Sequence, residues 1–196
     1  MRQLLFILIL LAGITTASAQ SDTTSAEELR SIIASLDTDP ATRDRATYLL
    51  GEALKNAPGT ELPDMQVVLR SGEQASLREM VDGNTLLIFY DPYCPECHEL
   101  MAQLTADDTF NSTVAGQRLK VIAVYPEYDM ESWENPAEPL PAQWIDAIIT
   151  PDGSEAVYDL FSIPVTPSTF FVGCDRSIVL KHPDASQILQ TVRNLH

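Results

Sequence analysis

Two cysteines, Cys94 and Cys97, follow directly on a short apolar run, and this arrangement constrains the fold of the chain more than any other feature. Residues 85–90 are rich in Leu, Ile and Phe, which is typical of a strand buried on both faces. Pro95 suits the first position of a helix. The sequence therefore predicts a strand, a short turn and a helix, with Cys94 at the helix N-terminus and Cys97 one turn further on.

This placement gives the first sulfur a chemical role. Free backbone N–H groups and the helix dipole at a helix N-terminus favour a thiolate. A second thiol one turn away is placed to resolve the mixed disulfide that Cys94 would form with a partner. The pattern predicts thiol–disulfide exchange in which the Cys94–Cys97 disulfide is the redox group, without a separate cofactor.

Three other interpretations remain open. A structural Cys94–Cys97 disulfide would close a very small loop and stabilise little, but it would suit a non-catalytic binding module. A zinc site needs about four ligands, and no second paired motif accompanies the cysteines, so no metal site is predicted. A peroxiredoxin-like peroxidase is disfavoured because Asp91 stands where such an enzyme has Thr, three residues before the reactive Cys. The remaining candidate zinc ligands are Cys174, His98, His182 and His196.

The first nineteen residues have the pattern of a signal peptide. Arg2 precedes the apolar run 4–11, and Ala17-Ser18-Ala19 gives the small-x-small motif of a cleavage site. The alternative, a retained membrane anchor, is disfavoured because the apolar run is too short to span a bilayer. We expect residues 1–19 to be removed and the mature protein to be exported, to the periplasm or beyond, without membrane insertion.

The charge and the cysteine count limit the partners. The chain has 12 basic and 28 acidic residues and a formal net charge of −16, which argues against nucleic acid and anionic membranes. An odd total of three cysteines argues against a disulfide-stapled scaffold. Cys174 is expected to be a free, partly buried thiol, with dimer formation or a third redox role as alternatives. The oligomeric state is not predicted.

The rest of the chain divides into a helical extension, residues 20–58, and a main domain, residues 59–196. A pair of helices is expected within 26–56. From residue 59 on, strands alternate with helices, which predicts an α/β domain with a mixed sheet and helices on both faces. Expected strands cover 66–69, 85–90, 119–125, 168–172 and 178–181. Helices are expected after Ser76 and Pro95 and near 108–116, 141–148, 154–161 and 185–195, and 126–141 reads as an inserted surface loop.

Four segments together resemble the TlpA/ResA type of thioredoxin-like proteins. They are residues 62–77, the run 86–90, the Cys94–Cys97 motif and residues 163–172. The resemblance covers 59–196 and implies a thioredoxin-like fold with an added N-terminal strand pair and thiol–disulfide exchange outside the cytoplasm. Its expected partners are protein thiols or disulfides and an upstream redox donor.

The resemblance also implies a substrate site. Thr166-Pro167 should be a cis peptide bond that faces the cysteines, and the backbone of Thr166 should pair with an incoming peptide. Tyr93 and Pro95 complete the expected substrate-binding set. Tyr93 stands where relatives often have Trp before the first cysteine.

Three positions depart from the family pattern. Ile88 and Leu100 occupy places where relatives carry proton-handling acids, and Glu96 replaces the usual Pro before the second cysteine. A carboxylate beside the thiols disfavours the thiolate, so Glu96 predicts a modest bias toward the reductant role. His98, when protonated, would partly cancel this effect.

Overall fold

The computed structural model describes residues 26–35, 37–153 and 156–195. The predicted signal peptide, the start of the helical extension and His196 lie outside these ranges. The chain divides into two units, with the boundary between Thr47 and Tyr48. Within the described ranges, no helix has both the length and the apolar character needed to cross a membrane.

The first unit contains helix α1 (Ala26–Ala34) and the start of helix α2 (Pro40–Leu54). Asp39 caps α2, because its Oδ1 accepts a hydrogen bond from Thr42 N at 3.1 Å, and Pro40 takes the first helical position. Arg43 Nη2 donates to Ser35 O at 2.9 Å and to Thr38 O at 3.1 Å, which ties the turn between the helices to α2. The predicted helix pair is therefore present.

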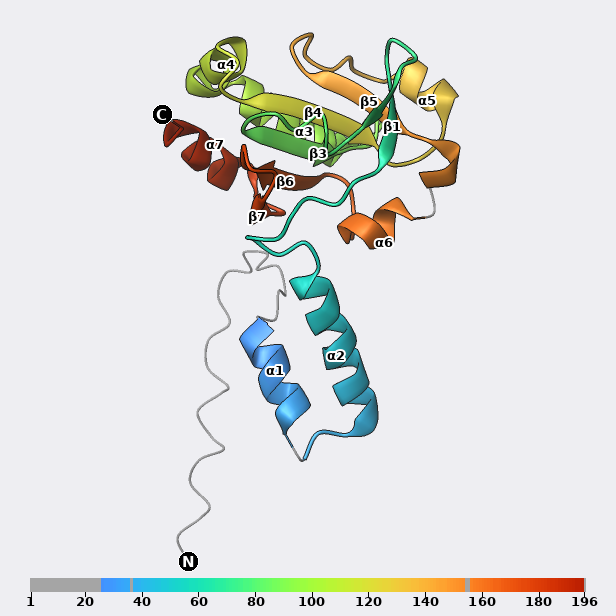
Figure 1. Ribbon diagram of the computed structural model, residues 1–196, viewed down its shortest axis with the longest axis vertical. Helices are drawn as coiled ribbons and strands as arrows, with labels where there is room; N and C mark the ends of the chain where they lie inside the picture. Colours follow the sequence, from blue (N-terminus) through green and yellow to red (C-terminus); the bar gives the residue numbers. More distant parts are fainter. Residues whose placement is uncertain (1–25, 36, 154–155, 196) are drawn as a thin grey trace, which may run out of the picture. The chain divides into compact units, whose positions relative to one another are not determined.

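The second unit is built on a seven-stranded mixed sheet of order β2-β1-β5-β4-β3-β6-β7 (Figure 1). The three neighbouring strands β3, β4 and β5 are parallel, and the other pairings are antiparallel. The predicted α/β class with a mixed sheet is thus confirmed. The strands are β1 (Gln66–Leu69), β2 (Gln74–Ser76), β3 (Thr85–Phe89), β4 (Lys120–Tyr125), β5 (Ile145–Ile149), β6 (Ser168–Val172) and β7 (Ile178–Lys181).

Helices and loops bury both faces of this sheet. Helices α3 (Pro95–Thr105), α4 (Asp108–Ala115) and α7 (Ala185–Arg193) share one core with the face of β3 that carries Leu86 and Ile88. Helix α6 (Val157–Phe161) shares the other core with Leu87 and Phe89. Because successive side chains of a strand point to opposite faces, β3 has every residue buried. This strand is the rigid base from which the cysteine loop departs.

The helix expected near 141–148 is wrong, since residues 145–149 form strand β5. Ile145, Ile148 and Ile149 recur at the spacing of one helix face, which explains the wrong prediction. The segment forms a strand because it pairs with β4 on one side and β1 on the other. Its β-branched residues also suit a strand buried on both faces.

Two other segments differ from expectation. Ser76 Oγ does accept Glu79 N at 3.1 Å, but the predicted helix is only a turn, and Ser76 itself ends strand β2. Residues 126–141 contain helix α5 (Met130–Glu134) within the expected loop, and its Trp133 is 3 % exposed. The insertion therefore lies on the surface as expected, but Trp133 anchors it to the core.

The two margins of the sheet are closed differently. Beside β7, Ile178 N donates to Thr60 O at 2.8 Å and Leu62 N donates to Arg176 O at 2.9 Å, so residues 59–62 pair with residues 176–178, where the strand begins. An isolated antiparallel bridge joins Glu61 to Ser177 within this segment. At the opposite margin, β2 is only three residues long.

Candidate active site

Cys94 is the N-cap residue of α3. Its backbone is extended, at φ −78° and ψ 117°, and its sulfur accepts a hydrogen bond from Cys97 N at 3.2 Å. Pro95 begins the helix, as the sequence predicted. The side chain of Cys94 is half-buried and is thus the accessible sulfur of the pair. Its Sγ sits against a helix N-terminus, where a backbone N–H can stabilise a thiolate.

Cys97 differs sharply from Cys94 because it is fully buried. It lies in the core with Met101 and Leu104 of the same helix. Burial, and next a hydrogen bond with Cys94, raise the pKa of the Cys97 thiol to about 12. Neither sulfur is engaged in a disulfide in this structure. The arrangement therefore combines one accessible sulfur with one protected, neutral thiol.

The loop before β6 completes the site. The Thr166-Pro167 peptide bond is cis, as the resemblance implied. Thr166 O lies 3.6 Å from Cys94 Sγ, so the loop touches the accessible sulfur. Val165, next to it, is 66 % exposed. An extended chain that approaches Cys94 would meet the backbone of this loop.

The two predicted tuning residues occupy different places. Glu96 is exposed and its Oε2 lies 3.6 Å from Cys94 Sγ, close enough for the thiol to donate to it. The His98 ring Nε2 lies 3.1 Å from Pro92 O, within the loop that carries Cys94. Glu96 therefore faces the sulfur directly, whereas His98 contacts the backbone of its loop.

The two positions that lack the family acids are apolar here. Ile88 is fully buried in strand β3, and Leu100 packs against the core of α3. No carboxylate therefore arises from either position.

Sequence reasoning missed a buried carboxylate in β5. The side chain of Asp146 is 12 % exposed, and it accepts hydrogen bonds from Tyr90 Oη and Trp133 Nε1, each at 2.8 Å. Arg70 Nε lies 2.7 Å from its other oxygen. Burial, followed by the Asp146 charge, holds the pKa of Tyr90 well above its usual range, so its hydroxyl stays a donor. The position of Asp146 between apolar residues could have indicated a buried acid. The segment was expected to be a helix, however, and a helix does not predict the partners that strand pairing brings to Asp146.

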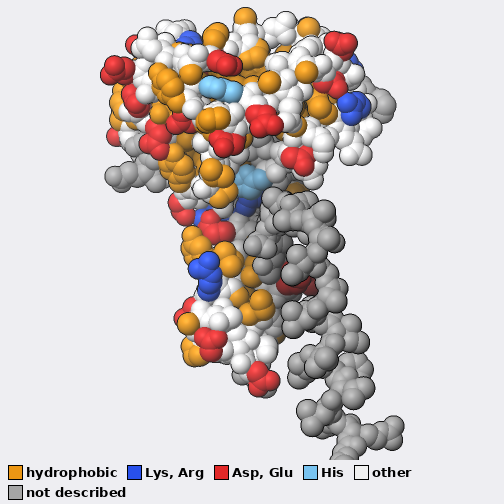
Figure 2. Space-filling view, turned by 180° about the vertical axis from the view of Figure 1, so that it is seen from behind, with side chains coloured by type: hydrophobic (Ala, Val, Ile, Leu, Met, Phe, Trp, Pro, Cys, Tyr) orange, Lys and Arg blue, Asp and Glu red, His pale blue; other side chains and the backbone are white. Residues whose placement is uncertain are grey.

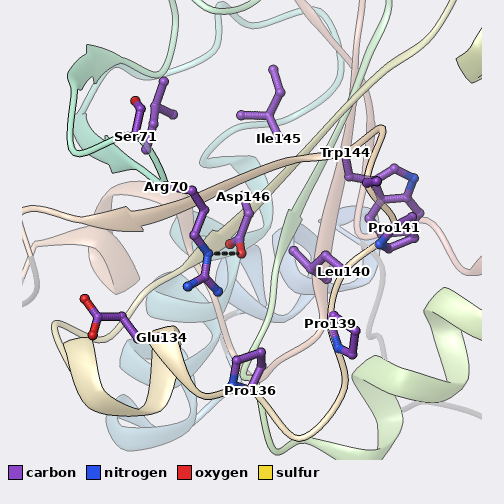
Figure 3. A pocket seen from close by; sticks show the side chains of 12 residues that line it. Arg70, Ser71, Glu134, Pro136, Pro139, Leu140, Pro141, Trp144, Ile145 and Asp146 are labelled. Carbon is purple, nitrogen blue, oxygen red and sulfur yellow. Dashed lines mark hydrogen bonds and ion pairs between the residues drawn. The ribbon is translucent and has the colours of Figure 1, made fainter.

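A cavity of about 600 Å³ lies beside this carboxylate (Figure 3). Arg70 and Asp146 face one another at its wall, and the proline-rich segment 136–141 lies beside them. Neither cysteine of the pair lines it. The cavity is separate from the sulfur site.

The surroundings of the site are acidic. Burial, and then the charges of Asp91, Asp129 and Glu127, raise the pKa of Tyr125 to about 12. Figure 2 shows one face of the molecule, with many acidic and few basic side chains on it. Across the described ranges, no three His, Cys, Asp or Glu side chains are grouped so as to hold a metal ion.

Cys174 lies far along the chain, in the turn after β6. It is exposed, so the expectation of a partly buried thiol is wrong. It lies in the turn between β6 and β7, where Asp175 beside it is also exposed.

Several solved structures resemble this fold. A thioredoxin-like protein from Bacteroides caccae matches with a TM-score of 0.79 and 21 % identity, over 87 % of this chain and 61 % of that one. The thioredoxin domain of a thiol-disulfide oxidoreductase from Bacteroides vulgatus matches with a TM-score of 0.63 and 20 % identity, over 71 % and 99 %. A thiol:disulfide interchange protein from a Bacteroides species gives 0.62 and 20 %, over 72 % and 91 %.

These likenesses define the fold. The chain has a thioredoxin-like fold, as the sequence resemblance predicted. It spans about three fifths of the length of the Bacteroides caccae protein. No family model and no curated protein matches the sequence significantly.

Proposed function

We propose that this protein is an exported thiol–disulfide oxidoreductase that acts on polypeptide thiols and disulfides through Cys94 and Cys97, with a modest bias toward reduction. One observation carries the proposal. An accessible sulfur caps a helix and touches the cis-proline loop, while a second thiol one turn away is buried and protected. A structural disulfide would have no need for such a difference in access.

The reduction of a partner proceeds in two exchanges. The thiolate of Cys94 attacks one sulfur of the partner's disulfide; an S–S bond forms to Cys94, and the partner's other sulfur leaves as a thiolate and takes a proton from water. Cys97 then gives its proton to water, and its thiolate attacks Cys94 Sγ to form an S–S bond. The partner's remaining sulfur leaves as a thiolate. The partner's disulfide has then been reduced by two electrons, and Cys94 and Cys97 have been oxidised to a disulfide. A dithiol donor returns the pair to the reduced form.

The raised pKa of Cys97 gives these steps an order. At neutral pH this thiol is protonated and buried, so it does not compete with Cys94 for the partner's disulfide. It acts after Cys94 is occupied, when the mixed disulfide places an electrophilic sulfur beside it. Because Cys94 and Cys97 are only one helical turn apart, the Cys97 sulfur can still reach the Cys94 sulfur.

The substrate contacts follow from the exposed rim. The Thr166 backbone and Pro167 would receive an extended peptide, and Tyr93 and Pro95 would flank it on the side of α3. Tyr93 is 54 % exposed, as such a contact requires. The Glu96 carboxylate beside Cys94 supports the reductive bias, because it disfavours the thiolate and hence the reduced form. His98, when protonated, would offset part of that charge.

Export to the periplasm or beyond is part of the proposal and is supported by the pattern of residues 1–19. The partners are protein thiols or disulfides and an upstream redox donor. Nucleic acid is not among them, in keeping with the net charge of −16.

Insulin reduction tests the proposal. The wild type with dithiothreitol as donor should accelerate insulin precipitation, and Cys94→Ser should abolish the acceleration. Cys97→Ser should accumulate a mixed disulfide on Cys94, visible on a non-reducing gel. Cys174→Ser is the matched control and should behave as the wild type does. Equal inactivity of the wild type and Cys94→Ser would instead favour a binding module with a structural cysteine pair.

A further inference from the structure

The Asp146 carboxylate joins three segments that are distant in the sequence. Tyr90 lies just after β3, Trp133 lies in α5 and Arg70 follows β1, and each donates to Asp146 at 2.7–2.8 Å. The Arg70 guanidinium also lies 4.1 Å from the centroid of the Trp133 ring and donates to the Trp133 carbonyl. A carboxylate that is only 12 % exposed and accepts from three donors restrains the position of each donor.

Two of these donors belong to segments that meet again beside the redox site. Tyr90 begins the loop that ends at Cys94, and Asp91 holds that loop by accepting Tyr93 N at 2.7 Å and Cys94 N at 3.1 Å. Trp133 belongs to α5, which ends at its C-cap residue Asn135. Tyr93 Oη donates to Asn135 O at 2.6 Å.

The contacts therefore close a ring. It runs from Asp146 through Tyr90 and the loop to Tyr93, across to Asn135, and through α5 and Trp133 back to Asp146. Tyr93 is the residue directly before Cys94, and more than half of its surface is exposed. The ring of contacts fixes this exposed aromatic side chain next to the accessible sulfur.

We propose that Asp146 is a positioning residue for substrate selection: by holding Tyr90 and Trp133 it keeps Tyr93 fixed as one wall of the approach to Cys94. This inference rests on the proposed function. A polypeptide must pass the wall to reach the sulfur, whereas a small disulfide need not use it. Asp146 touches neither substrate nor sulfur and acts only through the ring of contacts.

The test compares two substrates. The rate with insulin is divided by the rate with dithionitrobenzoate, a small disulfide, for the wild type, Asp146→Asn, Tyr90→Phe and Tyr93→Phe. Each Tyr→Phe variant removes one hydroxyl donor of the ring of contacts and keeps the aromatic shape. Since one hydrogen bond is worth about 1 kcal/mol, the ratio should fall about five-fold in each Tyr→Phe variant. Asp146→Asn should give at least as large a fall, mostly through KM for insulin.

Tyr128→Phe is the matched control, because Tyr128 lies in the same insertion and its hydroxyl makes no hydrogen bond within the described ranges. Its ratio should equal that of the wild type. Unchanged ratios in Tyr90→Phe and Tyr93→Phe, with only a lower melting temperature in Asp146→Asn, would overturn the inference and leave the proposed function standing. A wild type that does not reduce insulin would overturn both.

Discussion

The carboxylate of Glu96 should slow the reaction of Cys94, and the structure sets the size of the effect. Glu96 Oε2 lies 3.6 Å from Cys94 Sγ at an exposed position. In water, two unit charges at this distance interact by about 1 kcal/mol. Screening at physiological salt reduces this by roughly a third, because the Debye length is about 8 Å. Glu96→Gln removes the charge and keeps the shape, so the thiolate of Cys94 becomes more populated.

The expected result is a faster alkylation of Cys94. Iodoacetamide should modify Glu96→Gln about two- to five-fold faster than the wild type at pH 7 and low salt, and less than about two-fold faster in 1 M NaCl, where the Debye length is about 3 Å. The assay follows the Cys94 peptide by mass spectrometry in a Cys174→Ser background. The same free energy limits the rise of the reduction potential to about 20 mV.

Glu99→Gln is the control for this measurement. Glu99 lies on the same helix, but its carboxylate accepts a hydrogen bond from Gln103 at 3.2 Å and does not contact Cys94. It changes the net charge by the same amount as Glu96→Gln. If the two variants alkylate at equal rates, or if Glu96→Gln is no faster than the wild type, the local electrostatic reasoning is refuted.

Three further outcomes are expected. Because burial raises its pKa to about 12, Cys97 should resist iodoacetamide below about pH 10 in the reduced folded protein, while Cys94 and Cys174 are modified. Equal labelling of all three cysteines before urea is added would contradict this. Exposed Cys174 should form covalent dimers on oxidation, seen on non-reducing gels and absent from Cys174→Ser. Phe161→Ala should lower the free energy of unfolding, measured by urea denaturation, by about 3–5 kcal/mol. The Phe161 side chain is fully buried, and its ring centroid lies 4.8 Å from that of Phe89. A loss below about 1 kcal/mol would count against this packing.

The strand, turn and helix around the cysteines could be predicted because the information is local. Pro95 and Cys94 specify the start of α3 within two residues, and the apolar run before them specifies β3. The cis peptide bond at Thr166-Pro167 was predicted from the family resemblance, not from composition. Features encoded by adjacent residues were thus within reach of sequence reasoning.

The Asp146 cluster could not be predicted because its partners are distant. Its donors lie 13, 56 and 76 residues away in the sequence, and only the pairing of β5 with its neighbours brings them together. The three isoleucines of β5 have the spacing of a helix face, so local periodicity favoured the wrong element. Tertiary pairing determined the structure of this segment, and with it the placement of the carboxylate that ties the insertion to the cysteine loop.

The way the sheet margins are closed bears on self-association. An open strand edge offers unpaired N–H and C=O groups on which another chain can add a strand. Residues 59–62 already pair with residues 176–178, where β7 begins, and β2 presents only three residues at the other margin. The second unit therefore offers a poor template for sheet-to-sheet polymerisation. Partial unfolding that detaches residues 59–62 from residues 176–178 would expose further unpaired N–H and C=O groups at this margin, and this is where aggregation under stress should begin.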